Sequence, residues 1–518
     1  MKGISNSNKL FFASVFISTI LSFISAYYFI FVKNINFAYF DANTRINIAR
    51  RIFDNLTPGL AQIGNVWPPF PQILMTPFVT FDYLWRSGLA AWFVSGIAYV
   101  VAGAFIFKTI EVITKKPYLG LLGALSFLVN INVLYLQSTA MSEVFFLATL
   151  SAIMYFFTMY TYKNNHFYLY PAAIAVFLAT LTRYEAYALV VGSGVIVFFT
   201  QFFSSLGRKK AESTLILFLV PASLGIILWS FYLWIIFGDP LYWLHYYGAV
   251  SSGAPTVQKA TVFRPSVFDA LGTYSTSVIY MCGLITTVFG GLGMFYTIVS
   301  KSIKKEFKYL LIFPLMIFIF MALTLMKNTP IEQPALSFSV FFDKSVNLMK
   351  EFNIRYGLSL LPFLIVFSIV LVNRIRFSFI PFILLVAFQT AAYFTTPYFL
   401  TYQLPLAVGY GIAEHSLFMR DNYDGGLILI SAKKHDPEMI QMDLPYKTFI
   451  HEGTQYYWNE STKKENPAKY ATWIIFDRNI PEDEVTKYLK DSPSLKKYDL
   501  VFMKEGVRIY KLTNKNKS

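Results

Sequence analysis

Residues 10–32 read LFFASVFISTILSFISAYYFIFV and contain no charged side chain. A transmembrane helix needs about 20 consecutive apolar residues, so this stretch is long enough to cross a bilayer. It is too long for the apolar core of a secretory signal peptide, and no cleavage-site pattern follows it. The stretch therefore predicts a first membrane-spanning helix that is not removed.

The composition of the whole chain agrees with a membrane protein. Its 518 residues are 55% hydrophobic and 14% charged, whereas soluble domains have about 25% charged residues. The charges are also unevenly placed, because residues 421–518 hold 16 basic and 15 acidic side chains. This distribution predicts a polytopic α-helical membrane protein with a soluble tail, and it excludes a disordered chain, a fibre and a compact cytosolic enzyme.

Further apolar stretches follow the first and give about 11 transmembrane helices. The predicted spans are 10–32, 88–107, 118–136, 144–162, 167–182, 187–204, 214–236, 274–299, 309–326, 355–373 and 378–396. Residues 396–412 are apolar but contain prolines and glycines, so they are left out of this count. The chain is accordingly predicted to divide into a membrane domain, 1–412, and a tail domain, 413–518.

The basic residues predict the orientation. With the N-terminus in the cytoplasm, every inside segment is basic, as in the loop that holds Lys115 and Lys116. Lys and Arg collect in cytoplasmic loops, so the net charge of +15 requires no nucleic-acid partner. An odd number of spans then places the tail on the outer face. The long loops 33–87, 237–273 and 327–354 also fall outside, where we expect the chemistry.

Cysteine and histidine usage gives a negative result. Cys282 is the only cysteine, so no intramolecular disulfide can form, and no pair of histidines has metal-ligand spacing. An exported domain without disulfides suits a prokaryotic cell membrane slightly better than a eukaryotic secretory pathway.

The first outer loop, 33–87, begins with a helical pattern. Residues 41–54 read DANTRINIARRIFD, with Ile46, Ala49 and Phe53 at helical spacing. This predicts an amphipathic helix in the membrane interface. Asp41 stands at its start, where it could be an N-cap that suits the helix dipole. It could equally be a general base at the membrane surface, and the two roles are compatible.

The same loop continues as NVWPPFPQILMTPF, residues 65–78. Its three closely spaced prolines favour an extended, rigid segment. Trp67 fits an interfacial anchor.

Two short outer turns carry charged residues at the ends of spans. Arg183 and Glu185 lie in the turn 182–186, and Glu143 ends the turn 137–143. Ionisable groups at membrane depth usually pair with one another or serve function. For the first turn the alternative is a local ion pair, and for Glu143 it is a helix cap formed with the preceding serine.

Taken together, these residues resemble the GT-C superfamily of membrane glycosyltransferases, which use polyprenyl-phosphate sugars. That group includes the protein O-mannosyltransferases and the lipid A aminoarabinose transferases. The resemblance rests on an ordered set of outer-face elements. They are Asp41 after the first span, WPPFPQIL at 67–74, LQSTAMSEVFFL at 136–147, LTRYEA at 181–186, FGDPLYW at 237–243 and NIRYGLSLLPF at 353–363.

The pattern departs from two branches of the superfamily. Protein O-mannosyltransferases carry an Asp-Glu pair in the first loop, whereas Ala42 follows Asp41 here. The tail also lacks the WWDxG motif of oligosaccharyltransferases. Single-sugar transferases of bacteria and archaea are therefore the nearer comparison.

The resemblance implies transfer of one sugar from a polyprenyl-phosphate donor to an acceptor, with inversion and with Asp41 as general base. Arginine binds phosphate oxygens bidentately, so Arg355, Tyr356 and Arg183 are expected at the donor phosphate. The alternative for Arg355 is a snorkelling residue at a helix end. Glu143, Glu185, Asp239, His245 and Trp67 are expected to line the site or bind the acceptor.

Some of these residues also have simpler interpretations. Asp239 lies in Gly-Asp-Pro, a turn by composition. His245 lies among tyrosines and a tryptophan that suit an interfacial aromatic belt. A metal, if used, would be Mg or Mn held by oxygens, with Asp41 and Glu143 as the candidate ligands.

The tail alternates strand and helix patterns. Strands are predicted at GLILIS, YKTFIH, TWIIFD, YDLVFM and VRIYKL, with helices at 482–490 and 462–470. This alternation predicts a small extracytoplasmic α/β domain.

The resulting hypothesis is a membrane glycosyltransferase of the hexosyltransferase class. Its expected partners are a polyprenyl-phosphate sugar, a lipid, glycan or protein acceptor, and membrane lipids. The main alternative is a transporter or flippase for a lipid-linked sugar, although transporters usually have repeats and mid-membrane charges that this sequence lacks. A non-catalytic membrane scaffold is a third hypothesis.

Overall fold

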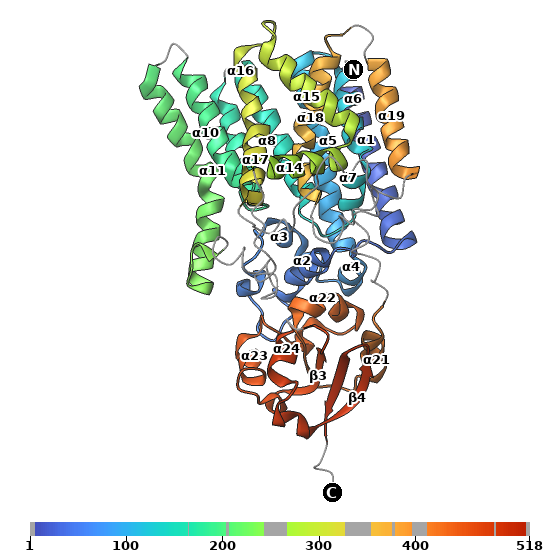
Figure 1. Cartoon of the computed structure of the whole chain (residues 1–518). Helices are drawn as coiled ribbons and strands as arrows, with labels where there is room; N and C mark the ends of the chain where they lie inside the picture. Colours follow the sequence, from blue (N-terminus) through green and yellow to red (C-terminus); the bar gives the residue numbers. More distant parts are fainter. Residues whose placement is uncertain are drawn as a thin grey trace, which may run out of the picture.

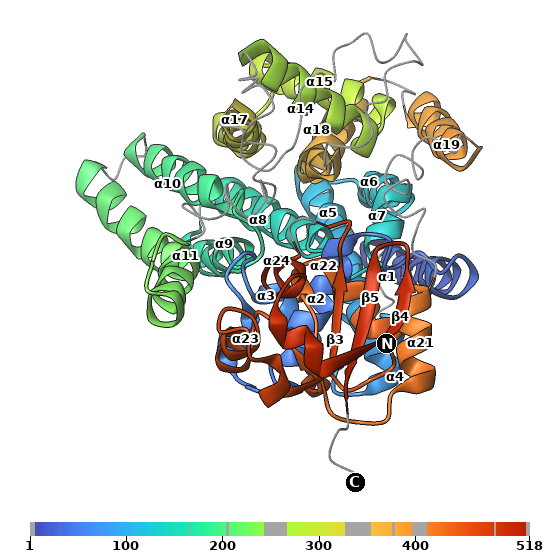
Figure 2. The same cartoon turned by 60° about the horizontal axis from the view of Figure 1, so that its bottom comes forward.

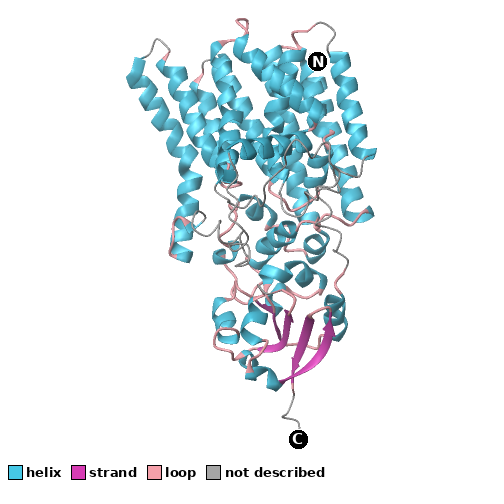
Figure 3. Cartoon of the chain, viewed as in Figure 1, coloured by secondary structure: helices cyan, strands magenta, loops and turns pink. Residues whose placement is uncertain are grey.

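The computed structural model of the chain describes residues 6–163, 165–203, 207–242, 267–326, 354–375, 379–395, 412–480 and 483–513. Figure 1 shows three layers: a helical bundle, a middle layer of short helices, and a sheet domain at the opposite end. Figure 3 shows that the strands are confined to that last layer. The N-terminus lies at the end of the bundle remote from the sheet domain.

The bundle is built from helices of very different lengths. They are α1 (Asn6–Ala26, extended by the π-helical turn Tyr27–Val32), α5 (Leu89–Thr114), α6 (Pro117–Leu128), α7 (Ile131–Leu136), α8 (Glu143–Lys163), α9 (Leu169–Thr180), α10 (Ala186–Phe202), α11 (Gly207–Phe237), α14 (Val267–Cys282), α15 (Leu284–Val299), α16 (Lys305–Lys308), α17 (Ile312–Met326), α18 (Leu361–Val372) and α19 (Phe379–Thr395).

Six helical segments among the described residues are long and apolar enough to cross a membrane, or seven if one bent pair counts as a span. Four further apolar helices, α6, α9, α10 and α19, are shorter. A multi-pass membrane protein is thereby confirmed, whereas the count of about 11 spans stays a prediction.

Two of the predicted spans are not continuous helices. The span 118–136 is divided between α6 and α7, and the span 274–299 is divided between α14 and α15, which meet at an angle of 116°. Gly283 lies at the second break with φ +89°, a conformation that glycine adopts without strain. Hydropathy reports only that these residues are apolar, so it could not predict where the helix direction changes.

The two breaks contact each other through one asparagine. The side-chain Oδ1 of Asn130 accepts hydrogen bonds from the backbone of Asn132 and Val133 and so caps α7. Its Nδ2 donates to the carbonyl of Met281, at the end of α14, over 3.0 Å. Irregular backbone inside a membrane protein needs such internal partners, because lipid supplies none.

The middle layer contains α2 (Phe40–Arg51), α3 (Phe70–Met75) and α4 (Asp82–Ser87). The predicted amphipathic helix is α2, but eight of its twelve residues are buried. It is covered by protein on both sides, so the prediction of a helix lying in the membrane interface is wrong. Its N-cap is Tyr39, and Asp41 lies in the first turn, so the N-cap interpretation of Asp41 is also wrong.

The proline-rich segment is only partly extended. Helix α3 begins at Phe70 and holds Pro71 in its first turn. The missing N–H of a proline costs nothing there, because first-turn N–H groups have no partner within the helix. The prediction of an extended segment is therefore wrong for α3.

The sheet domain contains all five predicted strands. They are β1 (Leu427–Leu429), β2 (Phe449–Ile450), β3 (Ala471–Asp477), β4 (Tyr498–Lys504) and β5 (Val507–Leu512), in the order β2-β1-β3-β5-β4. The β1 strand is parallel to both of its neighbours, and the two pairs that involve β5 are antiparallel. Figure 2 shows β3, β5 and β4 side by side.

The helices of this domain are α21 (Glu414–Asn422), α22 (Ala432–Gln441), α23 (Gln455–Ser461) and α24 (Glu484–Leu489). The predicted helix 482–490 corresponds to α24. The predicted helix 462–470 is wrong, because α23 ends at Ser461 and only a short 3-10 turn, Pro467–Lys469, follows.

The sheet domain packs on the middle layer through α22 and α2. The amide of Asn47 on α2 donates to the carbonyl oxygen of Asp436 at 3.0 Å and to its carboxylate at 3.1 Å. The indole of Trp85 on α4 donates to Asn47 at 3.0 Å. Asp54, just after α2, accepts the backbone N–H groups of Tyr446 and Lys447 at 3.0 and 3.2 Å. These bonds fix the sheet domain to the loop that carries Asp41.

Candidate active site

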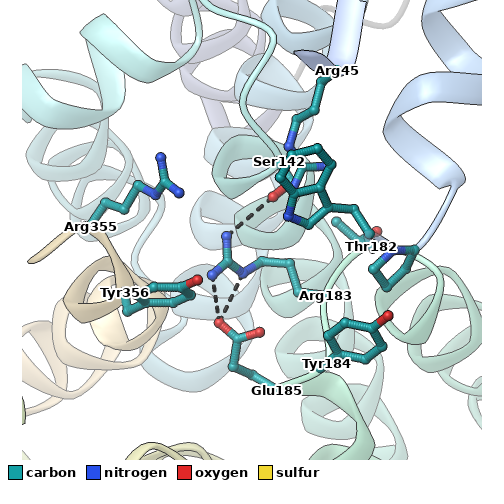
Figure 4. Close-up of a pocket in the computed structure, with 10 residues that line it drawn as sticks. Arg45, Ser142, Thr182, Arg183, Tyr184, Glu185, Arg355 and Tyr356 are labelled. Carbon is teal, nitrogen blue, oxygen red and sulfur yellow. Dashed lines mark hydrogen bonds and ion pairs between the residues drawn. The ribbon is translucent and has the colours of Figure 1, made fainter. Parts of the chain in front are cut away.

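Three arginines from separate segments reach one pocket where the bundle meets the middle layer (Figure 4). Arg45 comes from α2, Arg183 from the turn between α9 and α10, and Arg355 from the 3-10 turn Ile354–Leu360 that precedes α18. The other lining residues are Trp67, Pro68, Ser142, Thr182, Tyr184, Glu185 and Tyr356. The pocket and its open mouth hold about 300 Å³ not filled by protein atoms, which is at the lower end for a small-ligand site.

Arg355 joins the two carboxylates that sequence analysis singled out. One Nη atom of its guanidinium pairs with Asp41, and its Nε lies 3.0 Å from Oε1 of Glu143. Arg355 is only 5% exposed. A snorkelling residue would extend its charge into water, so that interpretation does not describe Arg355 here.

Arg183 pairs with acidic residues on both sides. Its Nη1 lies 2.8 Å from Oε1 of Glu143, and its Nη2 lies 2.7 Å from Oε1 of Glu185. It also donates to the Ser142 hydroxyl at 3.2 Å. The ring of Tyr356 lies 4.6 Å from the Arg183 guanidinium carbon, within the range of a cation–π contact. The local ion pair expected as the simple interpretation exists, and it lines the pocket.

Arg45 has a different environment from the other two arginines. It is 4% exposed, and its Nε has no hydrogen-bond partner among the described residues. No ion pair recorded in the described part of the chain includes Arg45. Its guanidinium lies 4.5 Å from the ring of Trp67, and one amide orientation of Gln72 accepts from Nη1 at 3.3 Å. Burial lowers the pKa of Arg45 to about 10, with Asp41 and Glu143 opposing the shift. A buried cation with spare donors is suited to an anionic ligand.

Sequence analysis did not single out Arg45, although a signal was present. Arg45 follows Asp41 by four residues on one helix, so the two share a face. That spacing alone would have placed a cation beside the proposed base.

Asp41 is held as a carboxylate in this arrangement. Burial acts to raise its pKa, but the charges of Arg355 and Arg45 outweigh burial and hold the pKa below its usual value. Its side chain is 29% exposed, so an acceptor can approach it.

The turn that carries Arg355 is fixed by a close backbone contact. A Cβ atom at Gly357 would lie 2.4 Å from the carbonyl of Ser277 on α14. Only glycine permits this approach without movement of α14. The glycine in the sequence IRYGLSL therefore positions Arg355 and Tyr356.

The structure brings together most of the predicted site residues. Asp41, Glu143, Glu185, Arg183, Arg355, Tyr356 and Trp67 line the pocket or pair with residues that line it. Asp239 does not line it: its carboxylate accepts the backbone N–H of Leu241 at 2.9 Å in the turn after α11. His245 lies outside the described residues.

The two candidate metal ligands do not form a good site for a divalent cation. Arg355 contacts both Asp41 and Glu143 and so takes the bridging place that a metal would need. Arg183 and Arg45 add positive charge nearby. Hard divalent cations prefer a set of free oxygens, so we derive no step through Mg or Mn.

No family model and no curated protein matches the chain. Solved structures do match. ArnT from Cupriavidus metallidurans, bound to undecaprenyl phosphate, aligns over 98% of this chain and 98% of its own with a TM-score of 0.60 and 11% identity. The Archaeoglobus fulgidus oligosaccharyltransferase aligns over 99% of this chain and 75% of its own with a TM-score of 0.52 and 11% identity. The chain therefore has the fold of these GT-C transferases, which confirms the resemblance at the level of fold.

Proposed function

We propose that the chain transfers a single sugar from a polyprenyl-phosphate donor to an acceptor hydroxyl on the outer face of the membrane, with inversion. The observation that carries the proposal is the convergence of Arg45, Arg183 and Arg355 beside Asp41. The fold supports it, since a protein of the same fold was crystallised with undecaprenyl phosphate.

The arginines would bind the donor phosphate. Arg45 has an unpartnered Nε and can bind at once. Arg355 can exchange a carboxylate for phosphate oxygens, which it binds in the same bidentate geometry. Positive charge aimed at the phosphate stabilises the negative charge that develops as it leaves.

Asp41 would take the proton of the acceptor. While Arg355 is paired with it, Asp41 is a weak base. Once the donor phosphate draws Arg355 away, the pKa of Asp41 rises toward its ordinary value and the carboxylate becomes a better base. Donor binding thus prepares the base, and an empty site stays inactive.

The reaction would be a single displacement. The acceptor oxygen forms a bond to the anomeric carbon as the bond from that carbon to the phosphate oxygen breaks. The proton passes to Asp41, and polyprenyl phosphate leaves. Inversion follows because the acceptor attacks from the face opposite the leaving group.

The position of the pocket favours an enzyme over a transporter. Its residues lie at the start of α8 and in the turn between α9 and α10, where the bundle meets the middle layer. Transporters usually bind substrate near the bilayer midplane. We place the sheet domain outside the cell membrane and the N-terminus in the cytoplasm, which agrees with their positions at opposite ends of the bundle (Figure 1).

A donor panel tests the proposal. The purified protein and its Asp41→Asn variant are added to membranes that supply acceptors, and release of polyprenyl phosphate from labelled polyprenyl-phosphate sugars is measured with and without Mg or Mn. We expect turnover by the parent with one donor and its loss in the variant. Equal turnover by both proteins would exclude Asp41 as the base. Transbilayer movement of a lipid-linked sugar without its cleavage, measured in proteoliposomes, would favour a flippase.

A further inference from the structure

Three potential metal ligands meet inside the sheet domain, far along the chain from the pocket. They are His415 on α21, and His435 and Glu438 on α22. Each offers one ligand atom, and these atoms lie within 4.8 Å of one another. His415 is 8% exposed and His435 is 2% exposed, so the cluster belongs to the interior of the domain.

The facing atoms of this cluster lack partners. Nε2 of His415, Nδ1 of His435 and Oε2 of Glu438 are buried without a hydrogen bond among the described residues. A single buried orphan of this kind costs about 1–3 kcal/mol. A proton between His435 and Glu438 would leave Nε2 of His415 still unsatisfied. One cation would satisfy all three atoms.

A buried carboxylate orients the central histidine. Oδ2 of Asp483 lies 3.3 Å from Nε2 of His435, and its Oδ1 caps α24 through the N–H groups of Val485 and Thr486 at 2.8 and 3.2 Å. Asp483 is fully buried. Histidines that bind metals usually donate their second N–H to such a carboxylate. This contact leaves Nδ1 of His435, the atom that faces the cluster, as the free lone pair.

We propose that His415, His435 and Glu438 bind one Zn²⁺ ion. Two imidazoles and a carboxylate are a recurrent zinc ligand set, with bonds of about 2.0–2.2 Å. Tetrahedral ligands at those distances lie about 3.4 Å apart, so the side chains close by about 1 Å around the ion. Water completes the fourth position.

The site would have a structural role. Helix α21 opens the sheet domain, and α22 is the helix that packs on α2 through Asp436. Zinc would tie these two helices together at the kink of α22, where His435 has non-helical angles of φ −126° and ψ 20°. The ion would thereby hold α22 in the shape that contacts the loop carrying Asp41.

The test uses the full-length protein in detergent, stripped with a chelator and then titrated with zinc sulfate. We expect one tightly bound zinc per chain by calorimetry and elemental analysis, and a higher thermal midpoint with zinc than with magnesium. His415→Gln and Glu438→Gln should abolish tight binding, and Asp483→Asn should weaken it about 10- to 100-fold.

His451→Gln is the matched control. His451 is a buried histidine of the same domain with an unpartnered Nε2, but it is outside the cluster. This variant should bind zinc as the parent does. Each variant is checked for folding by gel filtration and circular dichroism. The proposal is overturned if the parent does not bind zinc, or if the folded Glu438→Gln and His415→Gln proteins bind it as tightly as the control.

Discussion

The two ends of α2 carry charges that are satisfied in different ways. At the sheet-domain end, Arg50 pairs with Asp54 at 2.7 Å and with Asp82 at 2.6 Å, and it donates to the carbonyl of Val79 at 2.7 Å. Asp54 in turn accepts two backbone N–H groups. At the pocket end, Arg45 keeps an unpartnered Nε, and Asp41 shares Arg355 with Glu143.

The difference separates structural charge from functional charge on one helix. A saturated network leaves no donor for a ligand, so the Arg50 end serves to dock the sheet domain. The pocket end has unused donors and a movable ion pair, which is what an anionic substrate requires. Each prediction below tests whether the two ends can be separated.

The largest expected effect is on chemistry alone. Asp41→Asn should lower sugar transfer by about 10²- to 10⁴-fold, the usual contribution of a general base. Its thermal midpoint and its donor binding should be retained. Asp54→Asn, at the other end of α2, is the matched control and should lower the thermal midpoint with little change in turnover per folded molecule. Loss of the same property in both variants would contradict the separation.

Arg50→Gln should have the opposite profile. Removing one partner of a buried ion pair costs about 3–5 kcal/mol of stability, here by leaving Asp54 without its cation. The thermal midpoint should fall, and limited proteolysis should release the sheet domain earlier. Arg86→Gln is the control, because the Arg86–Asp443 pair is more exposed and should contribute at most about 1 kcal/mol. Equal destabilisation by the two changes would show that Arg50 is not a special anchor.

Arg45→Gln should weaken donor binding without loss of stability. A hydrogen bond to a charged group contributes about 1.5–3 kcal/mol, which corresponds to a rise of roughly 10- to 100-fold in KM for the donor. The thermal midpoint should stay level or rise, because burial of an unpaired cation opposes folding. Arg374→Gln, at an exposed arginine after α18, should leave KM unchanged. A lower midpoint with an unchanged KM would assign Arg45 to structure.

The smallest effect concerns pH and the sheet-domain end. Burial lowers the pKa of His451 well below its ordinary value, and Arg51 on α2 adds to the shift. The unfolded chain therefore binds a proton below pH 6.5 that the folded chain excludes. Stability should fall with decreasing pH from about 6.5, by at most about 1.4 kcal/mol per pH unit.

His451→Gln should flatten that slope in a series of thermal melts. The ionisation of Asp41 should not change over the same range, because its pKa is already held low. A slope that survives the substitution would assign the pH dependence to another group.

Charged residues at the ends of apolar spans made much of the site predictable. Asp41, Glu143, Arg183 and Arg355 were visible because ionisable groups are rare in such sequences and because the topology places them on one face. Arg45 was missed because the helix that carries it was assigned to the lipid interface, where arginines point outward. In the structure that helix is enclosed by protein.

Features that depend on the tertiary fold could not be predicted. The bend at Gly283 lies within an uninterrupted apolar stretch. His415 and His435 are 20 residues apart in sequence and meet only because α21 packs on α22. The five strands, in contrast, were predicted because each is a short apolar run between polar turns.

The contact between Asn130 and Met281 has a consequence for biosynthesis. The donor and the acceptor are 151 residues apart, so at about 5–20 residues per second the ribosome needs roughly 8–30 s to make the second partner after the first. During that interval the amide has no access to Met281, although α6 and α7 have already emerged. The early helices must therefore wait in the insertion machinery or in a hydrated site, and lateral release into lipid is complete only after α14 arrives.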